Sequence, residues 1–486
     1  MIPLYSTSQI RKIDDYAINH LGVPSIVLME NASREIFEIT LSQINNLNIK
    51  KIGFVCGKGN NGGDGFAAAR HFVNAGYNVF VVYLASENEM SADCRTNFQL
   101  LRKMSVKLPG IKIKKFSNLS SLNDLRKCEI IFDAMLGSGV EGKLRKPYPE
   151  IINYLNKLNA LKVAIDIPTG LNSETGYSEL AIKADITITL GNYKKGLFIS
   201  DASDYSGNVF QGSIGISDKY YGDETTESFL IEPEDAMTGL PVRRKTLHKY
   251  AAGKVLTIAG SGLLPGAAVL TSVSALKIGA GASILCFPKS IREFVHRKLG
   301  EVVVQPYDDM NTEFLQVKNL KEIKERIKWA DVVAIGPGLG RNDKTQKAVQ
   351  SILKKHKPKF TVIDADAIFA LSKKRFRKIN LKNCVLTPHH SEFANLVGIS
   401  VTELRKDVLK YGKQFSSSTG SYLVLKDAPT IIFTPKGEVF INSSGNPALA
   451  KFGTGDVLTG FIAGLIAQSQ QIEKSIITAV YLHGLI

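Results

Sequence analysis

The stretch that most constrains the fold of this chain is residues 57–65, which read Gly-Lys-Gly-Asn-Asn-Gly-Gly-Asp-Gly. It holds five glycines in nine residues and follows a short apolar segment, residues 51–56, with the composition of a β-strand. Glycine at this density costs backbone entropy, and a chain gains from it mainly where something must approach the backbone closely. A strand, a glycine-rich loop and a helix that begins near Phe66 predict a phosphate or dinucleotide site. The alternative is a flexible surface loop.

Strands and helices alternate through the first half of the chain. Residues 1–45 predict two helices separated by a break at Gly22-Val23-Pro24, and Ser6 or Ser8 is a candidate N-cap of the first helix. Strands are predicted at residues 78–84, 129–136, 161–167 and 185–190. This alternation indicates an α/β domain with a parallel sheet, whose site lies where the strands end.

Oxygen-bearing side chains gather at two of these strand ends. Asp133 ends one strand, while Asp166 and Thr169 follow another. Because the carboxyl ends of parallel strands meet at one edge of the sheet, these groups converge near Asn61. Such oxygens suit a monovalent or divalent cation, or an acid/base pair. Their alternative role is to cap the turns that follow.

The alternation stops from residue 217 to residue 245, which predicts a domain boundary. It restarts with a strand at residues 253–259, the loop Gly260-Ser261-Gly262 and a helix of small residues from Gly266. The second half is therefore also α/β.

Near the end of the chain, Gly453, Thr454 and Gly455 precede Asp456 and an apolar helix, residues 457–467. Backbone N–H groups at a helix N-terminus bind anions such as phosphate, and an aspartate there can act as a base on an attacking hydroxyl. The alternative is a plain helix cap. The chain lacks the GxxxxGK[ST] nucleotide motif and the protein-kinase signature set, so a nucleotide site must use another scheme.

Composition narrows the class of protein. Hydrophobic residues make up 44% and charged residues 22%, which is typical of a globular protein, and no stretch is long and apolar enough to span a membrane. The five cysteines are widely spaced and form no CxxC pair, which favours a reducing cytoplasm. The formal charge of +16 comes from scattered lysines and arginines, which favour a solvated surface over a nucleic-acid interface.

Several ordered motifs of the first half resemble those of the NAD(P)H-hydrate epimerase family. They are Leu28-Met29-Glu30-Asn31-Ala32, residues 60–65, Asp133-Ala134 with Gly137, and Asp166-Ile167-Pro168-Thr169-Gly170. The second half resembles the ADP/ATP-dependent NAD(P)H-hydrate dehydratase family. Its motifs are Pro265-Gly266-Ala267-Ala268, residues 336–340, Asp364-Ala365-Asp366, Thr387-Pro388-His389 with Glu392-Phe393, and residues 446–458.

The resemblance implies a Rossmann-like three-layer domain at residues 1–222 and a ribokinase-like domain at residues 235–486. It implies the repair of NADH or NADPH that carries water at C6 of the nicotinamide ring. The first domain would interconvert the R and S hydrates. The second would use a nucleotide, ADP giving AMP and phosphate, to dehydrate the S form.

The resemblance also implies the site residues of the first domain. Asp166 would be a catalytic, substrate-binding group, and potassium would be held by Asn61, Asp133 and Thr169. The hydrate would contact two further sets: Asn60, Asn61, Gly62, Gly63 and Asp64, and Gly137, Ser138, Gly139, Val140, Glu141, Gly142 and Lys143.

For the second domain the resemblance implies Asp456 as the catalytic group acting on the C6 hydroxyl. Phosphorylation would turn that hydroxyl into a good leaving group, and magnesium would accompany ADP or ATP. The hydrate would contact Ala267, Gly338, His389 and Asp456. The nucleotide would contact Lys426, Asp427, Ala428, Pro429, Thr430 and Gly455.

The chain departs from the family pattern at three places. Glu141 stands where some members have lysine, and Asp427 stands where glycine is usual, which sets a carboxylate beside the expected phosphates. Relatives normally carry a further helical segment after Ile486, and we expect its loss to expose part of the last helix.

Two other hypotheses compete with repair. One is a ribokinase-like small-molecule kinase with a non-catalytic N-terminal binding domain, and the other is a first domain that acts only as a binding module, with RNA as a conceivable ligand. We expect a cytoplasmic homo-oligomer whose partners are the hydrate and an adenine nucleotide, with no nucleic acid and no membrane.

Overall fold

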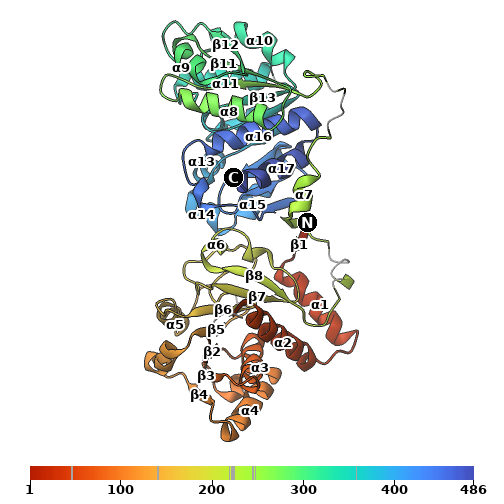
Figure 1. Ribbon diagram of the computed structural model, residues 1–486, viewed down its shortest axis with the longest axis vertical. Helices are drawn as coiled ribbons and strands as arrows, with labels where there is room; N and C mark the ends of the chain where they lie inside the picture. The colour runs from red at the N-terminus through yellow and green to blue at the C-terminus, as the bar shows by residue number, and fades with distance from the viewer. Residues whose placement is uncertain are drawn as a thin grey trace. The chain divides into compact units, whose positions relative to one another are not determined.

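The computed structural model describes residues 1–44, 48–139, 142–217, 219–220, 225–242, 246, 248–356 and 358–486. The chain forms two compact units (Figure 1). One is Pro3–Thr226, and the other is Glu227–Ile486 together with Met1–Ile2. The terminal ammonium of Met1 lies 2.8 Å from a carboxylate oxygen of Glu232 and 2.7 Å from one of Asp235, which ties the N-terminus to the second unit.

The N-terminal unit is built on a seven-stranded sheet in the order β4-β3-β2-β5-β6-β7-β8, with every pair parallel. This confirms the parallel sheet that the alternation predicted. The strands are β2 (Lys51–Cys56), β3 (Asn78–Tyr83), β4 (Ile111–Lys115), β5 (Ile130–Ala134), β6 (Leu161–Ile165), β7 (Ile186–Leu190) and β8 (Asn208–Gly212). The α-helices are α1 (Thr7–Asn19), α2 (Ser25–Ile44), α3 (Asn60–Asn74), α4 (Ala92–Lys107), α5 (Tyr148–Leu155) and α6 (Ala202–Tyr205).

Alternate side chains of the central strands feed two cores, one on each face of the sheet. Phe54 and Phe132 stack with ring centroids 4.4 Å apart and meet Phe72 of α3. Val55 and Ile131 point to the other face, where they join a cluster that includes residues of α5. A strand buried on both faces reads as a continuous apolar run, and the helices on its two faces make three layers.

The position of the glycines corrects one expectation. Helix α3 begins at Asn60 rather than near Phe66, so that residues 60–65 form its first turns instead of a loop. A Cβ on Gly62 would lie 2.1 Å from the carbonyl oxygen of Gly57, and one on Gly65 would lie 2.5 Å from the Ala134 Cβ. The glycines therefore allow the helix to begin directly against the strand ends, at the cost of helix propensity.

The C-terminal unit is built on a sheet in the order β1-β9-β18-β17-β16-β15-β14-β13-β10-β11-β12, antiparallel only where β17 meets β16 and β18 among the registers described. The strands are β1 (Ile2–Leu4), β9 (Ser228–Ile231), β10 (Lys254–Ile258), β11 (Ala282–Pro288), β12 (Val303–Tyr307), β13 (Val332–Ile335), β14 (Phe360–Ile363), β15 (Cys384–Leu386), β16 (Tyr422–Leu425), β17 (Ile431–Phe433) and β18 (Val439–Asn442). The α-helices are α7 (Pro233–Met237), α8 (Pro265–Lys277), α9 (Arg292–Lys298), α10 (Leu320–Trp329), α11 (Asp343–Lys355), α12 (Asp366–Leu371), α13 (His390–Val397), α14 (Val401–Lys406), α15 (Val408–Thr419), α16 (Thr454–Ser469) and α17 (Ile472–Gly484).

The small residues of this unit bring two helices together. Helix α16 packs on α8, and a Cβ on Gly460 would lie 2.4 Å from the Thr271 carbonyl oxygen, while one on Gly464 would lie 2.6 Å from that of Ala275. This close approach fixes the N-terminus of α16 over the sheet. The segment where we expected regular structure to stop in fact contains β9 and α7, because β9 gains a parallel partner in β18.

All five cysteines are buried thiols. None of the helices in the described parts of the chain is long and apolar enough to cross a bilayer.

The packing of α3 predicts the effect of adding one methyl group. Gly62→Ala should destabilise the N-terminal unit by about 2 kcal/mol or more, because the new Cβ meets backbone that cannot move aside. Gly59→Ala is the matched control, since nothing lies within 4 Å of its Cβ position, and it should cost less than about 1 kcal/mol. Hydrogen exchange at amides of β2 and α3 measures both, and equal protection in the two variants would contradict the packing argument.

Candidate active sites

A cavity of about 510 Å³ opens at the carboxyl ends of the strands in the N-terminal unit. Its walls come from α1, α2, the start of α3, the loop after β5, and residues that follow β6 and β7. The polar and charged side chains among its lining are Thr7, Arg11, Asp14, Ser25, Lys58, Asn60, Asn61, Asp64, Asp93, Ser138, Tyr148, Asp166 and Lys194.

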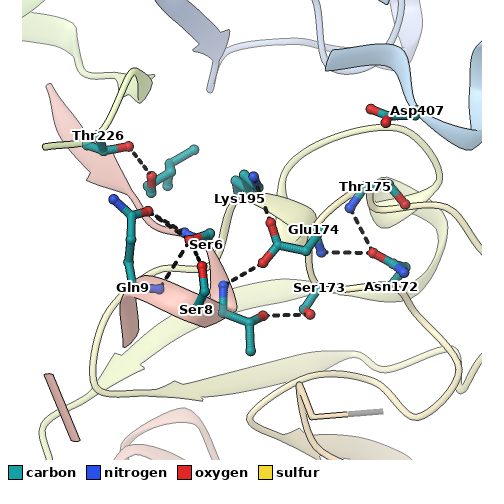
Figure 2. A network of polar contacts seen from close by, with 12 residues as sticks. Ser6, Ser8, Gln9, Asn172, Ser173, Glu174, Thr175, Lys195, Thr226 and Asp407 are labelled. Carbon is teal, nitrogen blue, oxygen red and sulfur yellow. Dashed lines mark hydrogen bonds and ion pairs between the residues drawn. The ribbon is translucent and has the colours of Figure 1, made fainter. Parts of the chain in front are cut away.

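Helix α1 is held at this cavity by contacts of its first turn with the loop after β6 (Figure 2). Ser6 caps the helix, because its Oγ accepts from the Gln9 amide at 3.2 Å, which confirms it as the cap. The Thr7 amide donates to a Glu174 carboxylate oxygen at 2.6 Å, and the Thr7 hydroxyl donates to the Ser173 hydroxyl at 2.7 Å. Lys195 lies 2.7 Å from the other oxygen of Glu174. The side chains of α1 that face the cavity are thereby fixed relative to the sheet.

Asp166 lies at the carboxyl end of β6 with φ at 68°, a left-handed backbone conformation that is uncommon outside glycine. Its Oδ1 lies 2.6 Å from the Nζ of Lys194, and its Oδ2 accepts from the Ser138 amide at 3.1 Å. The Lys194 side chain is only 1% exposed and also donates to the Thr189 hydroxyl and the Leu190 carbonyl. A backbone held in a rare conformation by such contacts is typical of functional sites.

The ion pair sets the charge of the cavity. Burial opposes ionisation of the Asp166 carboxyl, but the Lys194 ammonium and the hydrogen bonds outweigh it and hold the pKa of Asp166 below its usual value. Asp166 is therefore ionised at neutral pH. Sequence reasoning missed Lys194, although a lysine just after a strand that neighbours Asp166 in the sheet is the signal that could have found it.

Asp133 and Thr169 form a second polar cluster behind the cavity. The Thr169 amide and hydroxyl both donate to Asp133 at 2.7 Å, and the Met135 amide donates to it at 3.2 Å. Burial nevertheless raises the pKa of Asp133 to about 6. Asn61, which is 7% exposed, has neither side-chain polar atom hydrogen-bonded to any described residue. A buried amide without a hydrogen-bond partner is costly, which makes Asn61 a candidate for binding a ligand or an ion.

Only some of the residues expected to bind the hydrate line the cavity. Those that line the cavity are Asn60, Asn61, Asp64, Gly137, Ser138, Gly139 and Asp166. Gly62 and Gly63 face inward instead, where their missing side chains make room for Gly57 and Met29. Gly142 and Lys143 are exposed and lie outside the lining. Val140 and Glu141 lie outside the described residues.

In the C-terminal unit, Asp364 at the end of β14 is the centre of a buried network. Its Oδ1 accepts from the Lys426 ammonium and from the Thr387 hydroxyl, both at 2.8 Å, and its Oδ2 accepts from the Thr459 hydroxyl at 2.8 Å. Burial opposes the charge of Lys426, but Asp364 outweighs it and raises the pKa of that lysine. Thr459 lies on α16, so the network ties the first turns of that helix to the strand ends.

Asp456 lies in the first turn of α16, beside this network. Helix α16 begins at Thr454, and its N-cap Gly453 has φ at 93°, which glycine adopts readily. Burial raises the pKa of Asp456 to about 6; the charge of Asp364 adds to this rise and Lys426 opposes it. An aspartate with that pKa is mostly ionised at neutral pH, yet takes up a proton more readily than an exposed aspartate does.

The other residues expected in this unit are the small residues Ala267, Gly338 and Gly455, and His389. Ala267 and Gly338 adjoin each other, since a Cβ on Gly338 would lie 3.0 Å from that of Ala267, and a Cβ on Gly455 would lie 3.3 Å from the Lys426 ammonium. His389 caps α13: its Nδ1 accepts from the Glu392 amide at 3.4 Å, and its backbone pairs in a parallel bridge with Lys426. Its ring is 54% exposed, so it serves the fold and still faces solvent.

Asp427 contacts the imidazole of His390, which bears on the concern about a carboxylate beside phosphates. Its Oδ2 lies 2.9 Å from the Nδ1 of His390, and its Oδ1 accepts from the Ala428 amide at 2.9 Å. Burial opposes ionisation of Asp427, but these contacts outweigh it and lower its pKa. The Thr430 hydroxyl donates to the Asp427 carbonyl, so residues 427–430 form a turn with internal bonds.

Family models match both halves of the chain. A model described as NAD(P)H-hydrate dehydratase matches residues 255–486, and one described as YjeF-related protein N-terminus matches residues 25–196. A bifunctional NAD(P)H-hydrate repair enzyme of Moorella thermoacetica is 34% identical over 99% of this chain and 91% of its own length. One of Thermofilum pendens is 32% identical over 98% of this chain and 90% of its own length. These matches confirm the resemblance of both halves, in the same order.

Among solved structures, the ADP/ATP-dependent NAD(P)H-hydrate dehydratase of Bacillus subtilis, co-crystallised with ATP and Mg²⁺, is 29% identical. The match covers 54% of this chain and 89% of that one, with a TM-score of 0.45.

Breaking the buried ion pair of Lys194 with Asp166 is expected to lower the stability of the N-terminal unit strongly. Lys194→Met should cost the N-terminal unit about 3–5 kcal/mol, because it leaves Asp166 buried and charged without a partner. Adding Asp166→Asn in the same chain should recover much of that loss. Lys195→Met is the matched control: its pair with Glu174 is partly exposed and should be worth about 1 kcal/mol or less. Hydrogen exchange of β6 and β7 reports on all three, and equal losses from the two lysine variants would contradict this account.

Replacing Asp456 with a neutral residue is expected to raise stability by an amount that depends on pH. Its pKa of about 6 in the folded protein exceeds the ordinary value of 3.8, so the folded state binds this proton more tightly than the unfolded state. Ionised Asp456 therefore reduces stability above about pH 6, and the reduction disappears as the pH falls towards 4. Asp456→Asn should stabilise the unit by on the order of 1 kcal/mol at pH 8, with a smaller gain at pH 4.5. Urea unfolding followed by Trp329, the single tryptophan, reports on this unit; a gain that does not change with pH would contradict the assignment.

Proposed function

The chain belongs to the family of bifunctional NAD(P)H-hydrate repair enzymes, and on that premise we propose that it carries both activities. The N-terminal domain would interconvert the R and S hydrates of NADH and NADPH, and the C-terminal domain would dehydrate the S form with a nucleotide. The observation that carries the proposal is the 34% identity with a bifunctional relative over 99% of the chain. The two polar sites, one at the strand ends of each sheet, support it.

For the epimerase, we assign Asp166 to the reacting end of the substrate. Its carboxylate is fixed by Lys194 and by the Ser138 amide, so its position is set before any ligand arrives. Because it is ionised and lines the cavity, it can hold the C6 hydroxyl or a water molecule and accept a proton from it. Asn60, Asp64 and residues 137–139 would contact the rest of the hydrate, with Val140, Glu141, Gly142 and Lys143 as the continuation of that loop.

We assign potassium to Asn61, Asp133 and Thr169, and the unpartnered buried amide of Asn61 supports it. The donor set is one carboxylate and two neutral oxygens, which suits a hard cation. A bound cation would supply positive charge beside the cavity. The chain's own part is to hold these oxygens on two neighbouring strand ends, where Asp133 and Thr169 already bond to each other.

For the dehydratase, we assign Asp456 as the base that takes the proton of the C6 hydroxyl as it attacks the phosphoryl donor. The pKa of about 6 suits that task near neutral pH. Phosphorylation replaces hydroxide, a poor leaving group, with phosphate, a good one. The amides at the start of α16 would stabilise the negative charge on the transferred phosphoryl group. Ala267, Gly338 and His389 would line the pocket for the hydrate.

The nucleotide would bind along residues 426–430 and at Gly455. Lys426 supplies the positive charge, and the contact of Asp427 with His390 directs its carboxylate to the imidazole instead of to the phosphates. Magnesium would accompany the nucleotide and supply positive charge at its phosphates. We propose ADP as the donor, giving AMP and phosphate, and parallel assays with ADP and ATP test that choice.

We further propose a homo-oligomer in a reducing, cytoplasmic environment, with the hydrate and the nucleotide as its only small-molecule partners. The buried thiols support the environment. Light scattering of the purified chain tests the assembly state. A monomer at micromolar concentration would contradict the proposed homo-oligomer. A binding titration with single-stranded RNA at physiological salt tests the absence of a nucleic-acid partner.

The two-site assignment predicts that the activities separate. Asp456→Ala should abolish nucleotide-dependent recovery of the reduced cofactor, followed at its nicotinamide absorbance, and should leave exchange between R and S unchanged. Asp166→Ala should slow exchange by about 100-fold or more and spare dehydration of pure S hydrate. Replacing potassium in the buffer with tetramethylammonium should slow only the exchange.

The unmodified chain is the reference for these assays. If it fails to recover the cofactor from S hydrate with either nucleotide, the dehydratase proposal is wrong. If either single variant loses both activities while its circular dichroism spectrum is unchanged, the division between the two domains is wrong.

A further inference from the structure

A carboxyl group on α1, that of Asp14, faces the epimerase cavity and has no role so far. The residues of α1 in the cavity wall are Thr7, Ile10, Arg11, Asp14 and Ile18, which follow the three- and four-residue spacing of one helix face. Asp14 lies in the middle of that stripe. Its neighbour Asp15 points away, is exposed, and accepts from the Asn19 amide group at 2.6 Å.

Asp14 is half-buried, and one oxygen of its carboxyl is without a partner among the described residues. Its Oδ1 is shielded from solvent and has no hydrogen bond to any described residue. A buried carboxyl oxygen left unpaired costs free energy, and nothing in the fold of α1 requires it, because Ser6, Thr7 and Glu174 hold the helix. Asn61, on a different wall of the same cavity, is unpartnered as well. Two unsatisfied polar side chains that face one cavity indicate that a polar ligand completes both.

The surroundings of Asp14 differ from those of Asp166. Asp166 is neutralised by Lys194 at 2.6 Å, whereas Asp14 has no ion pair among the described residues. Burial raises the pKa of Asp14 to about 6; the charge of Lys194 opposes this rise and that of Asp166 adds to it. The other charged side chains in the cavity wall are Arg11, Lys58, Asp64 and Asp93. Carboxyl groups whose environments push their pKa values apart are suited to act as an acid and a base.

The proposed epimerisation requires such a pair. Inverting C6 through loss of its hydroxyl breaks the C6–O bond on one face of the ring as the N1 lone pair forms a C6=N1 double bond. The departing hydroxide takes a proton and leaves as water. A water molecule then adds to C6 on the other face, and its oxygen gives up a proton, so that N1 regains its lone pair. One proton is donated and one is accepted, and no oxidant or reductant is needed.

We propose that Asp14 is a second catalytic residue of the epimerase: it donates the proton to the departing C6 hydroxyl, while Asp166 accepts the proton from the water that adds to the opposite face. This inference rests on the proposed epimerase function. The reaction starts from the form in which Asp14 is protonated, which is the minor form at neutral pH and the major form below about pH 6. Its carboxyl becomes a carboxylate as water leaves, and the carboxylate of Asp166 becomes a carboxyl as water adds. Proton exchange with solvent restores the starting state, and the reverse reaction exchanges the two roles.

Asp64 is another carboxyl of the cavity wall whose pKa is raised by burial, in its case well above the usual value. It lies within the first turns of α3, however, where it is 7% exposed, and its backbone is packed against the strand ends by the flanking glycines. Asp14 lies on a separate helix, away from the strand ends that carry Asp166. The two groups that act on opposite faces of one ring must come from different walls, as Asp14 and Asp166 do. Among the carboxyl groups of the described cavity lining, Asp14 is the one with a buried oxygen that has no hydrogen bond.

The test compares the unmodified chain with Asp14→Asn, Asp14→Glu and Asp15→Asn, using pure R hydrate and chromatographic separation of R from S. Asp14→Asn should reduce kcat for exchange by about 100-fold or more. Asp14→Glu should recover part of the loss, and Asp15→Asn should match the unmodified chain. Nucleotide-dependent dehydration of S hydrate by the same preparations should be unchanged. Hydrogen exchange of β6 and β7 should match that of the unmodified chain, which shows that the N-terminal unit of each variant is folded.

Two further readouts separate an acid from a residue that only supports the fold. In water enriched in ¹⁸O, the unmodified chain should place solvent oxygen on C6 as R becomes S. Its kcat should fall as the pH rises through the range in which Asp14 ionises, and this fall should be absent from the residual rate of Asp14→Asn.

The outcomes are distinguishable. If the unmodified chain exchanges R and S but Asp14→Asn does so at the same rate, or if no ¹⁸O enters during exchange, the role of Asp14 is wrong and the epimerase proposal stands. If the unmodified chain itself does not exchange R and S, the epimerase proposal fails first.

Discussion

The ion pair of Lys194 with Asp166, at 2.6 Å, is the interaction on which the N-terminal site depends. It holds a charged carboxylate in a buried position at the end of a parallel strand, with a backbone conformation that few residues adopt. The C-terminal unit repeats the arrangement: Asp364 ends β14 and accepts from the Lys426 ammonium at 2.8 Å. In both units the lysine follows another parallel strand of the sheet. Parallel sheets gather strand ends at one edge, so two distant residues can meet there without a dedicated loop.

Each neutralised aspartate has a second carboxyl nearby with a pKa of about 6, namely Asp14 in one domain and Asp456 in the other. The first carboxylate of each site is fixed in charge, and the second can change its charge near neutral pH. Such a site carries an energetic cost, because a buried carboxyl that ionises at neutral pH lowers the stability of the fold. The apolar cores packed on the two sheets offset that cost.

The sequence predicted those elements and site residues whose signal lies within a short stretch of the chain. The alternation of strands and helices and the polar groups after the strands were local, and they led to both sheets and to Asp133, Asp166 and Asp456. The start of α3 was wrong, because glycine density is equally compatible with a loop and with a helix packed closely on backbone, and only the neighbouring strand decides between them. Strand β9 was missed because its partner β18 lies far away in the chain.

The residues that escaped prediction within the sites share one property. Lys194 and Asp14 become functional only through a neighbour brought by the fold: Lys194 through Asp166, and Asp14 through the wall of a cavity. Asp14 lies in neither a glycine-rich loop nor a strand-end motif, and Lys194 follows β7 without a glycine-rich motif beside it. The same holds for the partner of Asp427, since His390 follows a different strand, and its contact removes a repulsion that the sequence alone suggested.

The two titrating carboxyls are proposed to act in opposite protonation states, although burial is the largest cause of the raised pKa of both. Asp456 lies in the first turn of α16, where the helix dipole and Lys426 favour a negative charge and the charge of Asp364 opposes it. Asp14 lies in the middle of α1, where the charge of Lys194 favours a negative charge and that of Asp166 opposes it. With a pKa of about 6, each group can give or take a proton near neutral pH, so the bond that breaks or forms beside it decides which of the two it does.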